Sequence, residues 1–154
     1  MKIVIGADHR GFHLKLNLQE QIKMNKGERI EWLDSGAFTA ERTDYPLYAA
    51  KACEEILQGN AELGILICGS GIGMSIAANR FPGIYAGLAW NETSAHLARE
   101  HDGVNVLVLP SDFLSIHDAI NMVYAWLNAQ FKGGRYQERL EMLEDLADKA
   151  IDQK

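Results

Sequence analysis

Cysteine is scarce in this sequence, in which Cys53 and Cys68 are the only two among 154 residues. Their spacing matches no zinc-binding pattern, and a single pair does not suggest a disulfide framework. Thiols that stay free are typical of the reducing cytoplasm. We therefore predict a cytoplasmic protein with two free thiols and no bound metal.

Long apolar runs and an excess of positive charge are also missing. No run approaches the ~20 residues of a membrane span, and the chain starts directly with the strand-like segment 2–6. We therefore expect neither a membrane segment nor a signal peptide. The formal net charge of −6 argues against a general nucleic-acid surface. It does not exclude a small anionic substrate, because a few arginines can make the potential within one cleft positive.

Apolar strand-like segments alternate with helical segments five times, which predicts an α/β fold. Apolar residues make up 47% of the chain and charged residues 23%, a balance typical of one domain with a full core. The alternation favours a five-stranded parallel sheet with helices on both faces. The expected strands are 3–6, 29–33, 65–68, 84–89 and 104–109, and the expected helices are 12–25, 45–58, 74–79, 91–101, 111–131 and 135–148.

Residue types at the ends of these segments predict where the helices begin and end. Gly27 is expected to cap the first helix, and Asp44 to begin the second. Asn91 or Thr93 is expected to begin the fourth helix, and Ser111 or Asp112 the fifth. The last helix is amphipathic and follows a Gly133-Gly134 hinge, so its apolar stripe could pack on its own domain or on a second subunit.

The most distinctive segment, residues 64–79, joins an apolar run to a cysteine and a glycine-rich loop. Gly69, Gly71 and Gly73 can adopt backbone angles that other residues avoid, and they let a ligand approach the main chain. The small residues that follow predict a short helix whose free amides point back at the loop. Cys68 would then be a thiol at the end of a strand, beside backbone donors, where a thiol ionises more readily.

This glycine pattern is not a nucleotide-binding motif. The glycines are spaced as GxGxG rather than GxGxxG, and no Lys-Ser or Lys-Thr pair follows them, which excludes a dinucleotide fingerprint and a P-loop. A plain structural alternative remains, in which the segment is a tight turn with a core cysteine. Cys53 lies within a predicted helix and is expected to serve packing alone.

Parallel sheets bind ligands beyond the carboxyl ends of their strands. This rule selects four groups of residues: Asp8, His9 and Arg10; Cys68 to Gly73; Trp90 to Glu92; and Ser111 with Asp112. His9 and His101 could transfer protons near neutral pH, although a histidine at either place is often a cap or surface residue. His9 and His13 have the spacing of a metal pair on a helix, but no third ligand is suitably spaced.

Two arginines could bind an anion. Arg135 and Arg139 are four residues apart on one helix face, so their guanidinium groups can converge. A thiolate, backbone donors, a histidine and an arginine pair together favour proton abstraction beside a carbonyl group. The loop amides would hold the oxygen of the developing enediolate.

These residues lie in motifs that resemble the ribose-5-phosphate isomerase B family, within the group that also holds the galactose-6-phosphate isomerase subunits. The resemblance covers nearly the whole chain. The matching segments are Gly6 to His9 with Gly11-Phe12, Glu41 to Pro46, Ile65 to Asn79, His101, Asn105 to Leu107, Ala125 to Leu127, and Gly133 to Arg135 with Arg139.

The resemblance implies an aldose–ketose isomerase of the pentose phosphate pathway that needs no metal or cofactor. It also implies a Rossmann-like three-layer αβα sandwich over residues 1–154. The assembly would be a homodimer or a dimer of dimers with sites shared between subunits, in which the helix within 133–150 packs on the partner.

The resemblance also implies a role for each matching residue. Cys68 would be the base that moves a proton between C1 and C2 of the sugar, and His101 would open the furanose ring. Other contacts would come from Asp8, His9, Arg10, Tyr45 and Asp102, the enediolate would be held by Gly69, Ser70, Gly71, Ile72 and Gly73, and the phosphate by Arg135 and Arg139.

Two departures from the family pattern concern the substrate. Asp102 stands where asparagine is common, and Asp112 stands where many members have a phosphate-binding arginine. Arg10 replaces a small or apolar residue and could restore the charge from another side. The expected reaction is the interconversion of ribose 5-phosphate and ribulose 5-phosphate. The alternatives are an isomerase of a six-carbon sugar phosphate such as galactose or allose 6-phosphate, an isomerase of an unphosphorylated sugar, or a catalytically silent sugar-phosphate-binding subunit.

Overall fold

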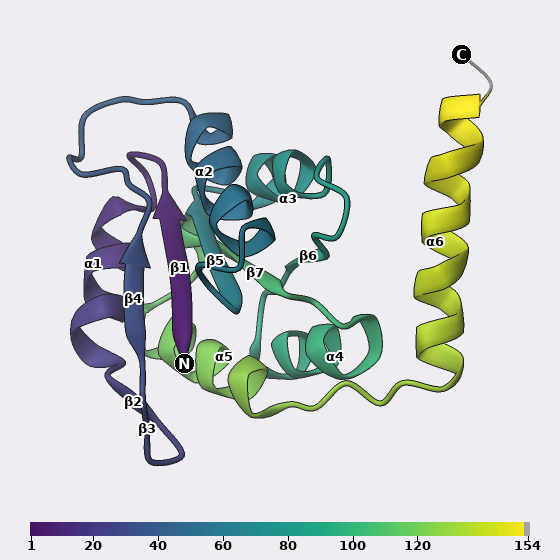
Figure 1. The fold of residues 1–154 in the computed structure, drawn as a ribbon. Helices are drawn as coiled ribbons and strands as arrows, with labels where there is room; N and C mark the ends of the chain where they lie inside the picture. The colour runs from purple at the N-terminus through teal and green to yellow at the C-terminus, as the bar shows by residue number, and fades with distance from the viewer. Residues whose placement is uncertain (153–154) are drawn as a thin grey trace.

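The computed structural model of the protein describes residues 1–152 and contains one five-stranded parallel sheet (Figure 1). Its strands are β1 (Lys2–Ala7), β4 (Glu31–Asp34), β5 (Leu63–Cys68), β6 (Ala86–Leu88) and β7 (Val106–Pro110). They lie in the order β4-β1-β5-β7-β6, and every neighbouring pair is parallel. The predicted parallel α/β fold is confirmed, and residues 153 and 154 of the predicted domain lie outside the described residues.

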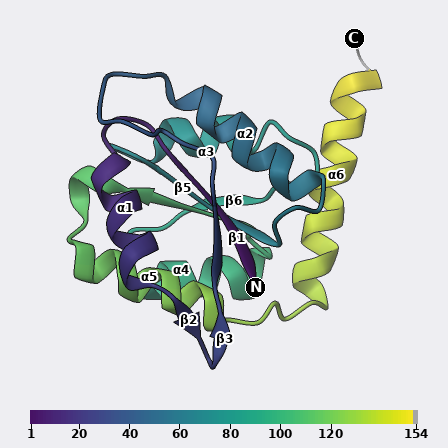
Figure 2. The same ribbon diagram turned by 60° about the vertical axis from the view of Figure 1, so that its left-hand side comes forward.

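Helices cover both faces of the sheet and give three layers (Figure 2). One face carries α1 (Phe12–Gln21), α4 (Glu92–Asp102) and α5 (Ile116–Asn128), and the other carries α2 (Tyr45–Leu57) and α3 (Ile72–Ala78). The central strand β5 is buried throughout. Its alternate residues Ile65 and Ile67 join the first core, whereas Leu66 and Cys68 join the second, because successive strand residues point to opposite faces. This double burial explains the unbroken apolar run.

The predicted first helix is too long. It ends at Gln21, and residues 22–30 form a small hairpin of β2 (Met24–Asn25) and β3 (Glu28–Arg29). Lys26 and Gly27 are the turn, with φ of 48° and 81°. Two successive left-handed residues are typical of a tight hairpin turn. Gly27 therefore turns a hairpin and does not cap a helix.

The predicted start of the fifth helix is also wrong. Residues Ser111–Phe113 form the short 3-10 helix η1, and α5 begins later, where the Ser115 hydroxyl accepts a hydrogen bond from the Asp118 amide at 3.1 Å. Asp44 occupies the N-cap position of α2 but makes no capping bond through its side chain. Asn91 caps α4 as predicted, through a reciprocal pair of bonds with Ser94.

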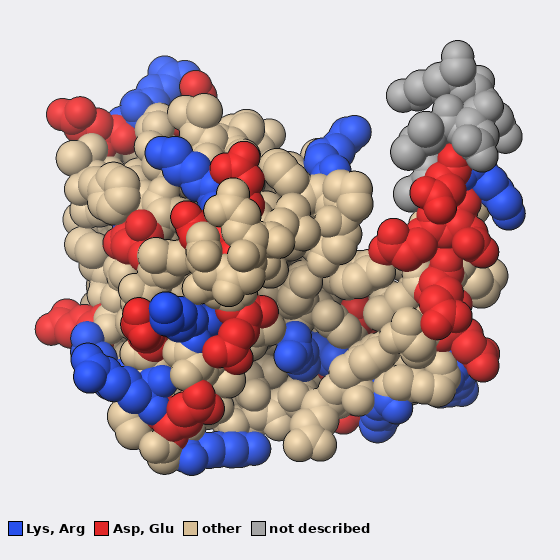
Figure 3. All heavy atoms as spheres, in the orientation of Figure 1, with Lys and Arg blue, Asp and Glu red and all other residues tan. Residues whose placement is uncertain are grey.

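The last helix, α6 (Arg135–Asp152), stands apart from the three layers (Figure 1). Acidic side chains gather along it (Figure 3). Leu140 is buried against the body, and the Tyr85 hydroxyl donates a 2.5 Å hydrogen bond to Glu144, which raises the pKa of Tyr85 to about 12. Leu143 and Leu146 are more than half exposed, so part of the predicted apolar stripe has no partner within residues 1–152. No helix among the described residues is long and apolar enough to span a membrane.

Candidate active site

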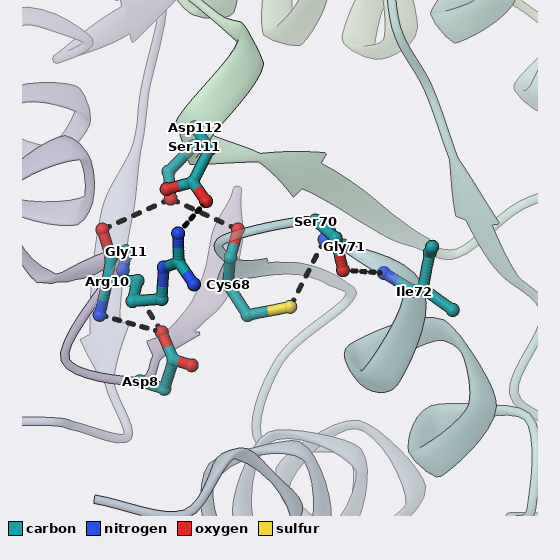
Figure 4. Close-up of polar contacts among 9 residues, drawn as sticks. All are labelled: Asp8, Arg10, Gly11, Cys68, Ser70, Gly71, Ile72, Ser111 and Asp112. Atoms are coloured by element: carbon teal, nitrogen blue, oxygen red, sulfur yellow. Dashed lines mark hydrogen bonds and ion pairs between the residues drawn. The ribbon is translucent and has the colours of Figure 1, made fainter. Parts of the chain in front are cut away.

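Three loops meet at the carboxyl end of the sheet, and Cys68 lies among them (Figure 4). Cys68 ends β5 beside Pro110 of β7 and is 5% exposed. Its Sγ accepts a hydrogen bond from the Gly71 amide at 3.2 Å. Such a bond is stronger when its acceptor carries negative charge, so a backbone donor is in place to stabilise charge on this sulfur.

The glycine loop can take this shape only with glycine at position 71. Gly71 has φ of +74°, and a Cβ there would lie 2.4 Å from Leu88 Cδ1. The Ser70 hydroxyl accepts a hydrogen bond from the Ile72 amide at 3.3 Å. On the other side of the loop, a Cβ on Gly73 would lie 2.7 Å from the ring of Tyr45. The structure therefore brings Tyr45 against the loop that also carries Cys68.

Asp8 and His9 are held by the chain around them. Asp8 is 6% exposed, and its Oδ1 accepts hydrogen bonds from the amides of Arg10 at 2.9 Å and Gly11 at 3.1 Å. His9 Nδ1 lies 3.3 Å from the Thr43 amide nitrogen, next to the start of α2. Asp8 therefore fixes the loop after β1, in addition to any contact that it makes with a ligand.

Arg10 forms an ion pair with Asp112 (Figure 4). The pair lies against Gly69, where an added Cβ would be 2.6 Å from Arg10 Nε and 2.8 Å from Asp112 Oδ2. The Ser111 hydroxyl lies 3.1 Å from both the Arg10 and the Cys68 carbonyl oxygens. These contacts tie the loops after β1, β5 and β7 together. Arg10 does bring a positive charge to this end of the sheet, as its sequence position suggests. Its pairing with Asp112, 102 residues away, could not be read from the sequence.

A second cluster contains His101 and both predicted phosphate-binding arginines. The His101 ring is stacked on Tyr136, with ring centroids 4.4 Å apart and an angle of 6° between the planes. The guanidinium carbons of Arg135 and Arg139 lie 5.0 and 5.7 Å from the centre of the same Tyr136 ring. Asp102, exposed beside His101, lines a groove of about 520 Å³ between the body and α6. We did not predict Tyr136 as a site residue, although it lies between the two arginines in sequence.

A carboxylate that is paired with a lysine lies beside His101. His101 Nε2 lies 3.3 Å from Glu100 Oε1, and the same oxygen is 2.7 Å from Lys132 Nζ. The hydrogen bond from Lys132, followed by one from His96, holds the pKa of Glu100 below its usual value, and the same contact raises the pKa of Lys132. The Glu100 carboxylate therefore stays negative beside the His101 ring.

The two clusters lie at opposite ends of the sheet. Cys68 pairs with Pro110 at the carboxyl end of β7, whereas His101 precedes Val106, which pairs with Gly64 at the amino end. A strand of five residues spans about 16 Å. One chain therefore does not bring the thiol together with His101, Arg135 and Arg139. Within residues 1–152, no group of three or more metal-ligating side chains is arranged to hold a metal ion.

Comparisons with known proteins agree over nearly the whole chain. The sequence profile of the Ribose/Galactose Isomerase family matches residues 3–143. Ribose-5-phosphate isomerase B of Escherichia coli strain K12 is 43% identical over 142 residues, which is 92% of this chain and 93% of that protein.

Solved structures give the same result. Ribose-5-phosphate isomerase B of Clostridium thermocellum matches with a TM-score of 0.91 at 37% identity, covering 97% of this chain and 99% of the other. The Mycoplasma genitalium enzyme with bound ribulose-5-phosphate matches with a TM-score of 0.86 at 36% identity, covering 96% of each chain. The chain therefore belongs to the ribose/galactose isomerase family.

Proposed function

We propose that this protein interconverts ribose 5-phosphate and ribulose 5-phosphate through an enediolate. The observation that carries the proposal is the buried Cys68 thiol at the carboxyl end of β5, with the Gly71 amide on its sulfur. Its family membership supports the same reaction, since similar proteins carry the name ribose-5-phosphate isomerase B and one was solved with ribulose-5-phosphate. The reaction moves one proton from C2 to C1 and one from the C2 hydroxyl to the C1 oxygen, so it needs no redox partner.

In this mechanism Cys68 acts as the base. As a thiolate it removes the C2 hydrogen of the open-chain aldose and returns the proton to C1. The proton of the C2 hydroxyl passes to the C1 oxygen in the same sequence, which leaves the carbonyl at C2 and forms the ketose. Negative charge develops on the carbonyl oxygen during this transfer. Backbone amides of the loop, with the Ser70 hydroxyl, would stabilise that charge. Asp8, His9 and Tyr45 would contact the sugar. Asp8 and His9 follow β1, whose last residue pairs with Ile67 next to Cys68, and Tyr45 lies against the glycine loop.

We propose that each complete site is built by two subunits of a homodimer. Ring opening by His101 and phosphate binding by Arg135 and Arg139 must occur on the same sugar that Cys68 deprotonates. These groups lie at the other end of the sheet in the same chain, so a partner subunit has to supply them. Several large apolar side chains are more than half exposed and are available to an interface: Ile72, Ile76, Trp90, Leu143 and Leu146. Two such dimers could pair further. We also assign the protein to the cytoplasm, where the thiol base stays reduced.

The Arg10–Asp112 pair favours a second candidate, an isomerase of a six-carbon sugar phosphate or of an unphosphorylated sugar. The pair is electrically neutral overall, whereas an arginine alone would add positive charge for a phosphate dianion. Asp102 adds a further carboxylate beside His101. A panel of five- and six-carbon aldoses, each with and without phosphate, separates these substrates through their kcat/KM values.

The central test is Cys68→Ala in the purified full-length protein, with formation of ribulose 5-phosphate as the assay. We expect turnover to fall by about 10²- to 10⁴-fold, which is the contribution of a general base. Cys53→Ala is the matched control and should retain turnover, because Cys53 is fully buried in α2. Normal turnover of Cys68→Ala would exclude the mechanism. Binding of sugar phosphate without solvent-proton exchange at C2 in the wild type would instead indicate a silent binding subunit.

A further inference from the structure

The centre of the second cluster is an aromatic side chain for which the proposed mechanism has no role. Tyr136 is half-buried, and three proposed site residues are arranged around its ring. His101 is stacked on it at 4.4 Å. The Arg135 and Arg139 guanidinium carbons lie 5.0 and 5.7 Å from its centre, and Arg135 Nη2 donates a 3.0 Å hydrogen bond to its hydroxyl.

We propose that Tyr136 is a positioning residue that fixes His101 relative to Arg135 and Arg139, so that ring opening and phosphate binding act on one substrate molecule. This inference rests on the proposed function and deepens it. Tyr136 itself takes no proton and touches no reacting atom. It acts through the stacked imidazole and the two guanidinium groups.

Such a residue is needed because the three groups come from two different helices. His101 is in the last turn of α4, whereas both arginines are near the start of α6. The joint between these elements includes Gly133 and Gly134, with φ of 63° and 55° and no atom within 4 Å of an added Cβ. The space that a side chain would occupy at these two glycines is open, so no side chain there fixes the angle of α6 and contacts elsewhere must define it.

Two contacts beside the joint partly fix the angle of α6. The Lys132 amide donates to the Glu100 carbonyl oxygen at 3.0 Å, and Lys132 Nζ lies 2.7 Å from the Glu100 carboxylate. Both contacts are made by Lys132, which precedes the two glycines in the chain. The Tyr136 ring is the contact that joins α6 itself to His101. The position of these groups matters for catalysis, because a displacement of about 1 Å can reduce a rate by ~10²-fold.

The chemistry of the two sugars allows this role to be measured. In ribose 5-phosphate the ring must open: the anomeric hydroxyl loses a proton, the C1–O4 bond breaks and O4 gains a proton. Ribulose 5-phosphate carries its phosphate on the C5 oxygen, so that oxygen cannot close a five-membered ring onto C2. Cys68 can therefore remove a C1 hydrogen from ribulose 5-phosphate with no ring-opening step.

The test compares Tyr136→Leu with Tyr136→Phe in the full-length protein. We expect Tyr136→Leu to lower kcat for ribose 5-phosphate roughly tenfold and to raise KM for both sugars, because stacking and both cation–π contacts are lost. Exchange of the C1 hydrogen in D₂O at saturating ribulose 5-phosphate should fall less than about threefold. Tyr136→Phe keeps the ring and should restore kcat to within about twofold of the wild type. Gln137→Leu, a change to the next residue of α6, is the matched control.

Three results would overturn the proposal. The first is wild-type kinetics in Tyr136→Leu. The second is an equal loss of isomerisation and C1 exchange in that variant, which would indicate a general effect on assembly or folding. The third is a Tyr136→Phe enzyme as impaired as Tyr136→Leu, which would assign the effect to the hydroxyl. A wild-type protein that is inactive toward both sugars is a separate outcome, and it would overturn the proposed function together with this inference.

Discussion

Among single residues, the two cysteines differ clearly in their surroundings. Cys53 is fully buried in α2, and burial raises its pKa to about 11, with a smaller contribution from the charge of Glu54. Cys68 is slightly exposed at the mouth of the sheet, and its sulfur accepts an amide hydrogen bond. A thiolate, rather than a thiol, is the form that reacts with alkylating reagents.

We therefore expect iodoacetamide at pH 8 to label Cys68 at least about tenfold faster than Cys53 in the native protein. At that pH only about one Cys53 molecule in a thousand is a thiolate, given its pKa of about 11. Peptide mass spectrometry after a timed reaction measures both rates. Denatured protein is the control and should label both sites alike, and equal native rates would contradict the prediction.

Single residues were also the scale at which sequence reasoning was most specific. An apolar run into Cys68 followed by glycines indicated a thiol at a strand end, and β5 has that thiol there. The ion pair of Arg10 with Asp112 was beyond such reasoning, because 102 positions separate the two residues. Only the meeting of two strand ends brings them together. Tyr136 was missed for a related reason, since its importance depends on where α6 lies.

At the scale of elements, the loop between β5 and α3 depends on Gly71. Gly71 holds a left-handed backbone angle of +74°, and Gly59, after α2, holds a similar angle of +77°. Their surroundings differ: an added Cβ would clash with Leu88 at position 71, whereas no atom lies within 4 Å at position 59.

This pair gives a matched test of the loop. Both Gly71→Ala and Gly59→Ala should lose about 1 kcal/mol from backbone strain. Only Gly71→Ala should also lose turnover, by about tenfold or more, because the clash moves the amide that contacts the Cys68 sulfur. Urea unfolding and steady-state kinetics measure the two effects separately. Full turnover in Gly71→Ala would show that the loop does not need this conformation.

Element boundaries were predicted less well than element types. Strands and helices follow from apolar periodicity, which is a property of many residues together. The hairpin at residues 22–30 depends on two residues, Lys26 and Gly27, and a Lys-Gly pair is equally compatible with a helix end. Likewise Ser111 and Ser115 are both good caps, and the choice between them follows from how Ser111 bonds to the carbonyls of Arg10 and Cys68.

At the scale of the whole molecule, the separation of the two clusters is the main consequence of the topology. His101 precedes β7, and Cys68 ends β5. Because these neighbouring strands are parallel, the start of β7 lies far from the end of β5. The sequence places all the groups needed for isomerisation in one chain, but periodicity and motifs do not indicate which end of the sheet each one occupies. This separation is why we propose that a second copy of the chain completes the site.

Mixing two inactive variants tests this shared site. Cys68→Ala and His101→Ala should each be inactive alone, and unfolding and refolding them together should restore about a quarter of wild-type activity. Half of randomly formed dimers are then mixed, and each mixed dimer has one site with an intact Cys68 facing an intact His101. Sites built within one chain would restore nothing, because each chain would still carry its own defect.

The matched negative control mixes His101→Ala with Arg139→Ala. Both changes fall in the same cluster, so each site of a mixed dimer still faces one defective cluster and activity should stay near that of the separate variants. If this second mixture regained activity, one site would have to take its His101 and its Arg139 from different chains. Restoration by neither mixture would place the complete site within one chain, and α6 would then have to move to the carboxyl end of its own sheet.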